Sequence, residues 1–247
     1  MADFNNLFDI VVRTKNSARS LENCLSAIKE HIPGSNIIVI DGKSTDNTLK
    51  IAEEFHATVF LEDKGLAYAT SFAGIICKKQ YILYIDSDVE IIRDDFINTA
   101  LSLLEDRKVG AVIGSSLGYP FNYGIPFGLI LIKREIINKI TFPDGIYGRE
   151  TYYVQRYFRK ARLKIKYIKN TMIHRSYSRE YRFWPEWQGS YVRLTAGFSP
   201  REVAYSLLVA FLMLSNKKKL KDFLYIPIFW IKLMRGYLNP VEWSGRR

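Results

Sequence analysis

The feature that most constrains the fold is an apolar run that ends in two carboxylates. Residues 81–85 are aromatic or branched aliphatic, and Asp86-Ser87-Asp88 follows them directly. Such a run predicts a buried strand, which would deliver its last residues to the carboxyl edge of an open α/β sheet, where ligands bind. Two carboxylates this close repel each other unless a cation lies beside them. Asp86 and Asp88 therefore predict a divalent-ion site facing a nucleotide diphosphate, with an ordinary solvated turn as the alternative.

Strand-like and helix-like segments alternate along the chain. Runs of β-branched residues bounded by turn residues indicate strands, and apolar residues three and four positions apart indicate helices. The alternation predicts a mostly parallel, doubly wound α/β sheet flanked by helices, with Thr14, Asp41 and Asp86 at one edge. The predicted strands are 9–14, 36–41, 57–61, 81–86, 109–114 and 163–168, and the predicted helices are 17–31, one ending near 55, 66–78, 94–106 and 150–161.

Polar residues in the loops of the first half favour a nucleotide pocket. Asp41 can accept a hydrogen bond from a base N–H or a ribose hydroxyl, and Lys64 with Gly65 offers a cation and a close backbone approach to phosphate. No phosphate-loop lysine motif and no Gly-x-Gly-x-x-Gly follows residues 9–14, which argues against ordinary NTPases and dinucleotide oxidoreductases. Without such loops, a metal ion has to hold the diphosphate.

Four segments in order resemble the signatures of a known enzyme family. Residues 11–16, 38–46, 64–67 and 82–88 are similar to successive motifs of family 2 glycosyltransferases, the inverting type with the GT-A fold, and the resemblance covers about residues 8–175. It implies a metal-dependent enzyme that moves a sugar from a nucleotide-sugar donor, such as a UDP- or GDP-sugar, to an acceptor. The implied donor-site residues are Thr14, Asn16 and Asp41 around the nucleoside, Asp86 near the ribose and metal, and Asp88 on the metal.

The chain departs from the family pattern at several positions. The family usually has Pro-Thr-Tyr-Asn where residues 13–16 read Arg-Thr-Lys-Asn, so an aromatic that could stack on the base is lost. An Arg and an Asn often stand where this chain has Thr70-Ser71. The aspartate that usually serves the family as general base is replaced by Thr151, which leaves Glu150 as the candidate base and Asp144 as its reserve.

The resemblance also implies a third metal ligand, His174. In many relatives a histidine at this place joins the carboxylates, although a lone histidine is more commonly structural. Imidazole, carboxylate and diphosphate oxygens together suit manganese (Mn²⁺), with magnesium (Mg²⁺) as the alternative.

Charge and cysteine content bound the setting of the protein. Residues 1–147 hold 15 basic and 19 acidic side chains, whereas residues 148–247 hold 21 and 6. A basic region of this kind suggests an anionic partner, which could be nucleic acid, an anionic membrane surface or a phosphorylated substrate. Since no RNA-binding or helix-turn-helix signature is present, we expect no nucleic acid. Two cysteines in apolar patterns, no export signal and no apolar stretch long enough to cross a bilayer indicate the cytoplasm.

The composition changes near residue 180. We expect a GT-A catalytic domain at 1–180, with nucleotide-sugar binding at about 8–90 and the acceptor side at about 110–180, followed by a basic, aromatic-rich helical extension at 181–247. The motif Gln-x-x-Arg-Trp of processive family members is not satisfied in this extension, which favours a single sugar addition.

Two apolar runs in the extension, 203–214 and 223–234, flank a cluster of lysines. Each is too short to span a bilayer, but an apolar helix beside lysines fits one lying in the membrane interface. We therefore expect peripheral attachment to the inner face of the cell membrane and a lipid-linked or other glycan acceptor. Packing on the catalytic domain or on a second copy, as a homo-oligomer, is the alternative. The expected acceptor or membrane contacts are Trp184, Trp187 and Trp230.

Three other functions compete with this interpretation. A polyprenyl-phosphate sugar synthase is the nearest, because a phosphate acceptor is already an anion and needs no base. A catalytically decayed module that binds membrane or nucleic acid belongs to another class, and Thr151 is its best support. Asp41, Asp86, Asp88 and His174 argue against decay because all are present. Sugar-nucleotide formation would need a glycine- and arginine-rich loop after the first strand, which the sequence lacks.

Overall fold

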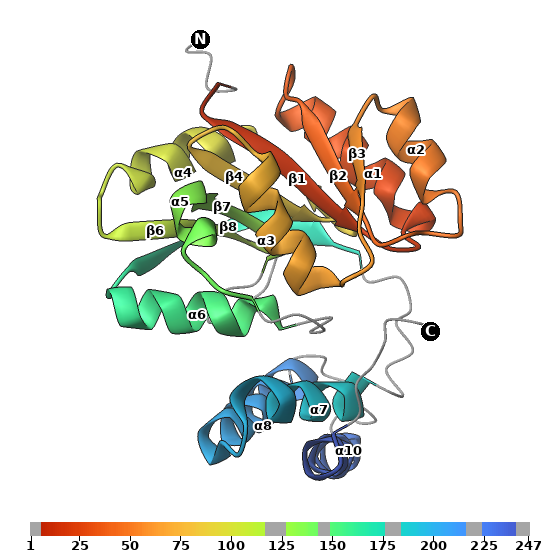
Figure 1. Ribbon diagram of the computed structural model, residues 1–247, viewed down its shortest axis with the longest axis vertical. Coiled ribbons are helices and arrows are strands. Elements are labelled where there is room, and N and C mark those ends of the chain that lie inside the picture. The colour runs from red at the N-terminus through yellow and green to blue at the C-terminus, as the bar shows by residue number, and fades with distance from the viewer. Residues whose placement is uncertain (1–5, 117–126, 143–148, 176–183, 216–223, 241–247) are drawn as a thin grey trace. The chain divides into compact units, whose positions relative to one another are not determined.

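The computed structural model describes residues 6–116, 127–142, 149–175, 184–215 and 224–240. The chain forms two compact units, Met1–Tyr177 and Ser178–Arg247, and each is described by itself. Figure 1 shows the first unit as a sheet between helices and the second as a group of helices. The separate roles expected for the two stretches, catalysis and membrane attachment, stay predictions.

One mixed sheet of eight strands forms the centre of the first unit. The strands are β1 (Phe8–Thr14), β2 (Ile37–Asp41), β3 (Thr58–Leu61), β4 (Tyr81–Asp86), β5 (Val89–Ile91), β6 (Val109–Ser116), β7 (Leu129–Lys133) and β8 (Lys164–His174). Their order across the sheet is β3-β2-β1-β4-β7-β6-β8-β5. β1 pairs in parallel with β2 and β4, β2 with β3, and β6 with β8, whereas β7 and β5 run antiparallel to their neighbours. The predicted mostly parallel α/β sheet is thus confirmed.

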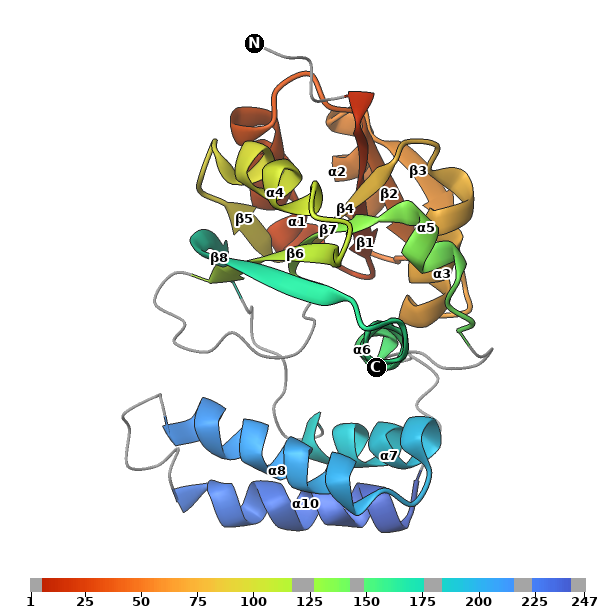
Figure 2. The ribbon, with the colours of Figure 1, turned by 90° about the vertical axis from the view of Figure 1, so that its left-hand side faces the viewer.

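Helices cover both faces of this sheet. They are α1 (Ala18–His31), α2 (Thr48–Glu54), α3 (Leu66–Ile76), α4 (Phe96–Leu104), α5 (Arg134–Asn138) and α6 (Glu150–Ala161). Alternate residues of a strand point to opposite faces, so Ile10 and Val12 of β1 join one core while Val11 joins the other. α1, α2 and α4 pack on the first core and α3, α5 and α6 on the second, and Figure 2 shows α1 and α4 on one side of the sheet with α3, α5 and α6 on the other.

β7 is a strand that the sequence pattern did not predict. It lies between β4 and β6 and pairs antiparallel with both, in the register Tyr81↔Lys133 to Ile85↔Leu129 with β4. Its apolar residues are all buried. Because a short apolar run looks the same in a strand and in a buried helix, periodicity alone could not assign it.

β8 is longer than predicted and returns to the end of β4. We expected it to end at residue 168, but it continues through Asn170, whose φ is 54°, to His174. Near Asn170, the pairing of β8 with β6 shifts register between Gly114 and Ser116. The last part of β8 pairs antiparallel with β5, with Val89 opposite His174. This pairing places His174 beside the residues that follow β4.

Three described helices make up the second unit: α7 (Trp184–Ala196), α8 (Pro200–Ser215) and α10 (Ile226–Leu238). α7 and α10 approach so closely that their backbones touch. A Cβ atom added at Gly189 would lie 1.9 Å from the Leu233 carbonyl oxygen, and one added at Gly236 would lie 1.9 Å from the Glu186 carbonyl oxygen. Glycine at these two positions is therefore required by the packing. The buried apolar cluster of this unit consists of Val192 of α7, Val203 of α8 and Phe229, Leu233 and Tyr237 of α10.

Large apolar side chains of the second unit also lie on its surface. Ile231 is 69% exposed and Ile228 is 48% exposed on α10, and Leu208 of α8 is 53% exposed. No helix in the described part of the chain is long and apolar enough to cross a bilayer.

Candidate active site

Three predicted nucleoside residues meet at the carboxyl ends of β1 and β2. Asp41 is fully buried, and its carboxylate accepts hydrogen bonds from Thr14 Oγ1 at 2.7 Å, from Ser44 Oγ at 2.6 Å and from the Ser44 N–H at 2.7 Å. Asn16 adopts a φ of 49° and accepts a hydrogen bond from the Thr45 N–H at 2.9 Å. The parallel pairing puts Thr14 directly opposite Asp41. The loops that would surround a nucleoside are thus organised by their own hydrogen bonds.

The Lys64-Gly65 turn differs from the expectation. We expected its backbone to be open to a phosphate, but Glu62 Oε2 accepts hydrogen bonds from the Lys64 and Gly65 N–H groups, each at 2.7 Å. Glu62 is buried, and its carboxylate occupies the two amides that a phosphate would otherwise bind. The Lys64 ammonium lies 4.8 Å from the centre of the Tyr68 ring. The lysine side chain is therefore the part of this turn that can meet a diphosphate.

Asp46 and Thr48 hold the N-termini of two helices. Asp46 accepts hydrogen bonds from the Ala18 N–H, the first amide of α1, at 3.1 Å, and from the Thr48 N–H, the first of α2, at 3.0 Å. Thr48 Oγ1 accepts another from the Ser17 N–H at 2.7 Å. We expected Ser17 to cap α1, and it occupies the N-cap position but makes no side-chain capping bond. The helix that follows β1 is instead capped from the loop that follows β2.

Arg13 joins Asp86 to Glu150 at the end of β1. Its guanidinium donates hydrogen bonds to Asp86 Oδ1 at 2.7 Å, to Glu150 Oε1 at 3.2 Å and to Thr70 Oγ1 at 2.9 Å. From the sequence alone, Arg13 stands out only as a departure from the family pattern, and this contact is not predicted. The available signal was an arginine inside an otherwise apolar strand, because a buried arginine requires carboxylate partners.

Burial and charge oppose each other at both members of this pair, and the net result is a raised pKa for each. Burial raises the pKa of the Glu150 carboxyl, and the positive charge of Arg13 opposes that rise without cancelling it. Burial by itself would lower the pKa of Arg13, but the negative charges of Asp86 and Glu150 outweigh it and raise that pKa. Arg13 therefore stays charged, whereas Glu150 takes up a proton more readily than an exposed glutamate.

Asp88 and His174 form the predicted metal pair. The β5–β8 pairing brings His174 Nε2 to 3.1 Å from Asp88 Oδ1. No group of three or more His, Cys, Asp or Glu side chains in the described part of the chain is arranged to hold a metal ion. Two ligands of this kind nevertheless fit a divalent ion whose remaining ligands come from a diphosphate, since Mn²⁺ accepts both imidazole and carboxylate. Asp86 lies nearby, with one oxygen bound to Arg13.

The other predicted site residues fall into two groups. Asp144 lies outside the described residues, and so does the side chain of Trp184. Trp187 and Trp230 belong to the second unit, where the Trp187 ring packs 4.7 Å from that of Tyr191 and Trp230 is 38% exposed.

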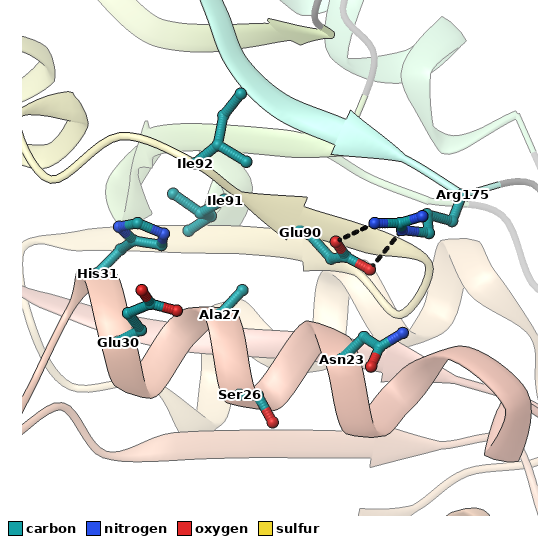
Figure 3. A pocket seen from close by; sticks show the side chains of 9 residues that line it. All are labelled: Asn23, Ser26, Ala27, Glu30, His31, Glu90, Ile91, Ile92 and Arg175. Carbon is teal, nitrogen blue, oxygen red and sulfur yellow. Dashed lines mark hydrogen bonds and ion pairs between the residues drawn. The ribbon is translucent and has the colours of Figure 1, made fainter.

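A separate pocket of about 280 Å³ lies between α1 and the β5–β8 edge (Figure 3). At one end of it, Arg175 donates two hydrogen bonds to Glu90, of 2.7 and 3.1 Å. His31, at its other end, has its Nδ1 atom 2.6 Å from Asp94 Oδ1. None of the predicted donor-site residues lines this pocket, and these charged side chains already have partners.

The fold and the candidate site together define the class of protein to which the chain belongs. A mostly parallel sheet whose polar and acidic strand ends converge on its carboxyl edge is the arrangement of nucleotide-binding α/β proteins. More narrowly, the chain belongs to Glycosyl transferase family 2, whose family model matches residues 9–182. The family expected from the sequence is confirmed.

The curated relatives that match are longer proteins. The chain is 30% identical over 121 residues to glycosyltransferase GlyG of Streptococcus pneumoniae, an alignment that covers 46% of this chain and 40% of that protein. It is 38% identical over 82 residues to an uncharacterized glycosyltransferase of Rickettsia bellii, covering 33% and 27%. A PGL/p-HBAD biosynthesis glycosyltransferase of Mycobacterium tuberculosis is 25% identical over 165 residues, covering 61% and 64%. The chain thus spans well under half the length of the first two.

Solved structures with the same fold include glucosyl-3-phosphoglycerate synthase from Mycobacterium tuberculosis. In complex with Mn²⁺ and UDP-glucose, that protein superposes with a TM-score of 0.61 at 17% identity, covering 79% of this chain and 81% of the other. A complex that also holds phosphoglyceric acid gives a TM-score of 0.64 at 17% identity, covering 79% and 82%. The likeness confirms the predicted GT-A type of α/β fold.

Proposed function

We propose that this protein is a divalent-metal-dependent glycosyltransferase that moves one sugar from a nucleotide-sugar to an acceptor with inversion at the anomeric carbon. The observation that carries the proposal is the Asp88–His174 contact of 3.1 Å at the strand edge where Thr14 and Asp41 also lie. Family membership supports the reaction class. The Mn²⁺ and UDP-glucose found together in a protein of the same fold support a metal and a UDP-sugar.

Each residue then has a defined task. Thr14, Asn16 and Asp41 hold the nucleoside, and the Lys64 ammonium lies with the diphosphate. Asp88 and His174 would hold a divalent ion, with Asp86 beside it. When bound, such an ion supplies positive charge that neutralises the diphosphate as it leaves. The protein groups orient the donor and keep that charge in place.

The acceptor side has two candidate chemistries. A sugar hydroxyl has to lose a proton, and Glu150, whose raised pKa is the shift required of a base near neutral pH, is our candidate with Asp144 in reserve. A phosphate acceptor needs no base, as in a polyprenyl-phosphate sugar synthase. The second chemistry is favoured by one observation, since Glu150 is buried and bound to Arg13. In both cases we propose that the acceptor is lipid-linked.

A screen of donors tests the first part of the proposal. The melting temperature of the full chain should rise with one of the UDP-, GDP- or dTDP-sugars in the presence of Mn²⁺ or Mg²⁺, and much less without metal. Transfer to an acceptor, followed by NMR of the product anomer, tests inversion. If no nucleotide-sugar raises the melting temperature with either metal, the decayed binding module becomes the better explanation.

The acceptor chemistry is tested by Glu150→Gln. With a hydroxyl acceptor, kcat should fall by about 10² to 10⁴ while donor affinity changes little. With polyprenyl phosphate as acceptor, kcat should stay near that of the natural chain. A variant whose donor affinity collapses together with kcat would show that Glu150 supports the donor pocket and is not the base.

We further propose that α8 and α10 attach the protein to the inner face of the cell membrane. Their exposed apolar side chains and the lysines between them support this arrangement. The full chain should float with vesicles of anionic lipid, and less so at high salt. Ile228→Ser with Ile231→Ser should reduce flotation, whereas Ile75→Ser, at a position 74% exposed on α3, should not. If the full chain does not float at low salt, the acceptor need not be lipid-linked.

A further inference from the structure

Arg13 is a buried arginine tied to three other elements of the first unit. Its guanidinium bonds to Asp86 of β4, to Glu150 of α6 and to Thr70 of α3, at 2.7, 3.2 and 2.9 Å. Only 2% of its side chain is exposed. The positive charge of Arg13 is therefore held in place inside the protein, where water does not screen it.

The faces of the guanidinium are enclosed as well. Its central carbon lies 5.0 Å from the centre of the Phe127 ring and 5.5 Å from that of Tyr84. The Tyr84 hydroxyl in turn donates a hydrogen bond to the Thr70 carbonyl at 2.8 Å. The Nε atom is buried and has no hydrogen-bond partner among the described residues. Two carboxylates and two aromatic rings thus hold one planar cation here.

This arrangement makes the two carboxylates of the Asp-Ser-Asp segment unequal. Asp86 already has a cation at 2.7 Å, and its side chain is 35% exposed. Asp88 lies beside His174, with 16% of its side chain exposed. A carboxylate that already has a guanidinium partner gains less from a metal ion, since one oxygen is occupied and the guanidinium repels the ion.

We propose that Arg13 is a positioning residue that serves as the permanent counter-ion of the metal site. Its single positive charge offsets part of the negative charge of Asp86 and Glu150 before any ligand arrives. A divalent ion then binds the nucleotide-free protein weakly, through Asp88 and His174. The diphosphate supplies the missing ligands, so that metal and donor bind together. This inference deepens the proposed function and rests on it.

Binding of Mn²⁺ to the nucleotide-free full chain tests the proposal without measuring activity. Free Mn²⁺ can be followed by its electron paramagnetic resonance signal. Arg13→Met alone would leave Glu150 buried without a partner, which can unfold the protein. We therefore compare the double variant Arg13→Met/Glu150→Gln with the single variant Glu150→Gln, because the two differ only at Arg13.

The expected result is a gain of metal affinity. The double variant should bind Mn²⁺ about tenfold more tightly than Glu150→Gln, because one nearby positive charge is lost and Asp86 is released. Adding UDP should reduce the difference in Mn²⁺ affinity between the double variant and Glu150→Gln. Arg13→Lys in the Glu150→Gln background keeps the charge and should restore the weak binding. Adding Asp86→Asn to the double variant should remove the gain.

Two failures are distinguishable. If the double variant is folded by circular dichroism and binds Mn²⁺ no more tightly than Glu150→Gln, Arg13 is a structural residue and the inference is wrong, even if the melting temperature has fallen. If Asp88→Asn in the natural chain leaves Mn²⁺ binding unchanged, the metal site itself is misplaced and the proposed function loses its support.

Discussion

His174 Nε2 lies 3.1 Å from Asp88 Oδ1 although 86 residues separate them in the chain. The contact exists because β8 continues past Asn170 and pairs with β5, a strand of three residues. The second half of the first unit therefore completes a site that the first half begins. Substitutions that weaken the β5–β8 pairing should therefore disturb the Asp88–His174 contact, even where they change neither of these two residues.

Asp88→Ala should abolish the metal-dependent rise in melting temperature that a donor nucleotide produces. Without that carboxylate, the metal loses one of its two proposed ligands, and the diphosphate meets Asp86 and Asp41 without its cation. His174→Ala should weaken metal affinity by a smaller factor, because it removes a neutral ligand. Asp94→Asn is the matched control and should behave like the natural chain, because Asp94 is an exposed carboxylate that pairs with His31 at the end of α1.

The decisive measurement for these variants is a calorimetric titration with metal ion in the presence of UDP. A metal-dependent shift that survives in Asp88→Ala would contradict the assigned site. Unchanged metal affinity in His174→Ala would make that histidine a structural residue.

Asp46→Ala should destabilise the first unit by about 1–2 kcal/mol, because one carboxylate caps two helices. The hydrogen bonds from Thr48 and Ala18 prevail over burial and lower the pKa of Asp46 from its ordinary value of 3.8. Its contribution is thus fully present above pH 3.8 and is lost as the pH falls through the lowered folded-state pKa. Urea unfolding at several pH values, followed by circular dichroism, measures this. Glu53→Ala, on the exposed side of α2, is the control, and a cost equal to that of the control would refute the capping role.

Glu150 should give the opposite pH dependence. Burial raises the pKa of its carboxyl above the ordinary value of 4.5, so the folded state binds the proton more tightly than the unfolded state. The natural chain should therefore be most stable relative to Glu150→Gln below pH 4.5. The difference in unfolding free energy should shrink as the pH rises through the raised folded-state pKa. A difference that grows with pH over this window would mean that the Arg13 pair prevails over burial.

Gly189→Ala should destabilise the second unit, by about 2 kcal/mol or more, because its Cβ would lie 1.9 Å from a backbone oxygen of α10. Helix propensity alone predicts the reverse sign, a gain of about 1 kcal/mol. Ala204→Gly, at an exposed position of α8, tests propensity alone and should cost about 0.5–1 kcal/mol. All four tryptophans lie between residues 184 and 243, so their fluorescence reports on this unit. Unchanged stability in Gly189→Ala would show that the helices can move apart.

Much of the fold could be predicted from local patterns. The strands that end in Thr14, Asp41 and Asp86 are continuous apolar runs with polar termini, and the helices after them have regular apolar spacing. β5 and β7 could not be assigned in this way. A strand of three residues carries no periodicity, and a short apolar run fits strand and helix equally well.

The site was predicted less completely, because its contacts are not local. Thr70, Asp86 and Glu150 lie 57, 73 and 137 positions from Arg13, and nothing in the sequence around any of them indicates the others. Glu62 is the exception: it lies only two and three positions before Lys64 and Gly65, so this local partner of the turn was missed although it stands beside the motif. Sequence spacing predicted which side chains reach the edge of the sheet. Their partners depend on how separate elements pack.

The glycine contact between α7 and α10 also determines how the second unit can open. A contact of backbone on backbone has no long side chains that could stretch while the helices drift apart, so it is either formed or lost. The amides of α7 and α10 should then exchange with solvent through one shared opening, as a single cooperative folding unit. Helices that are far apart in sequence would thus behave kinetically as one element.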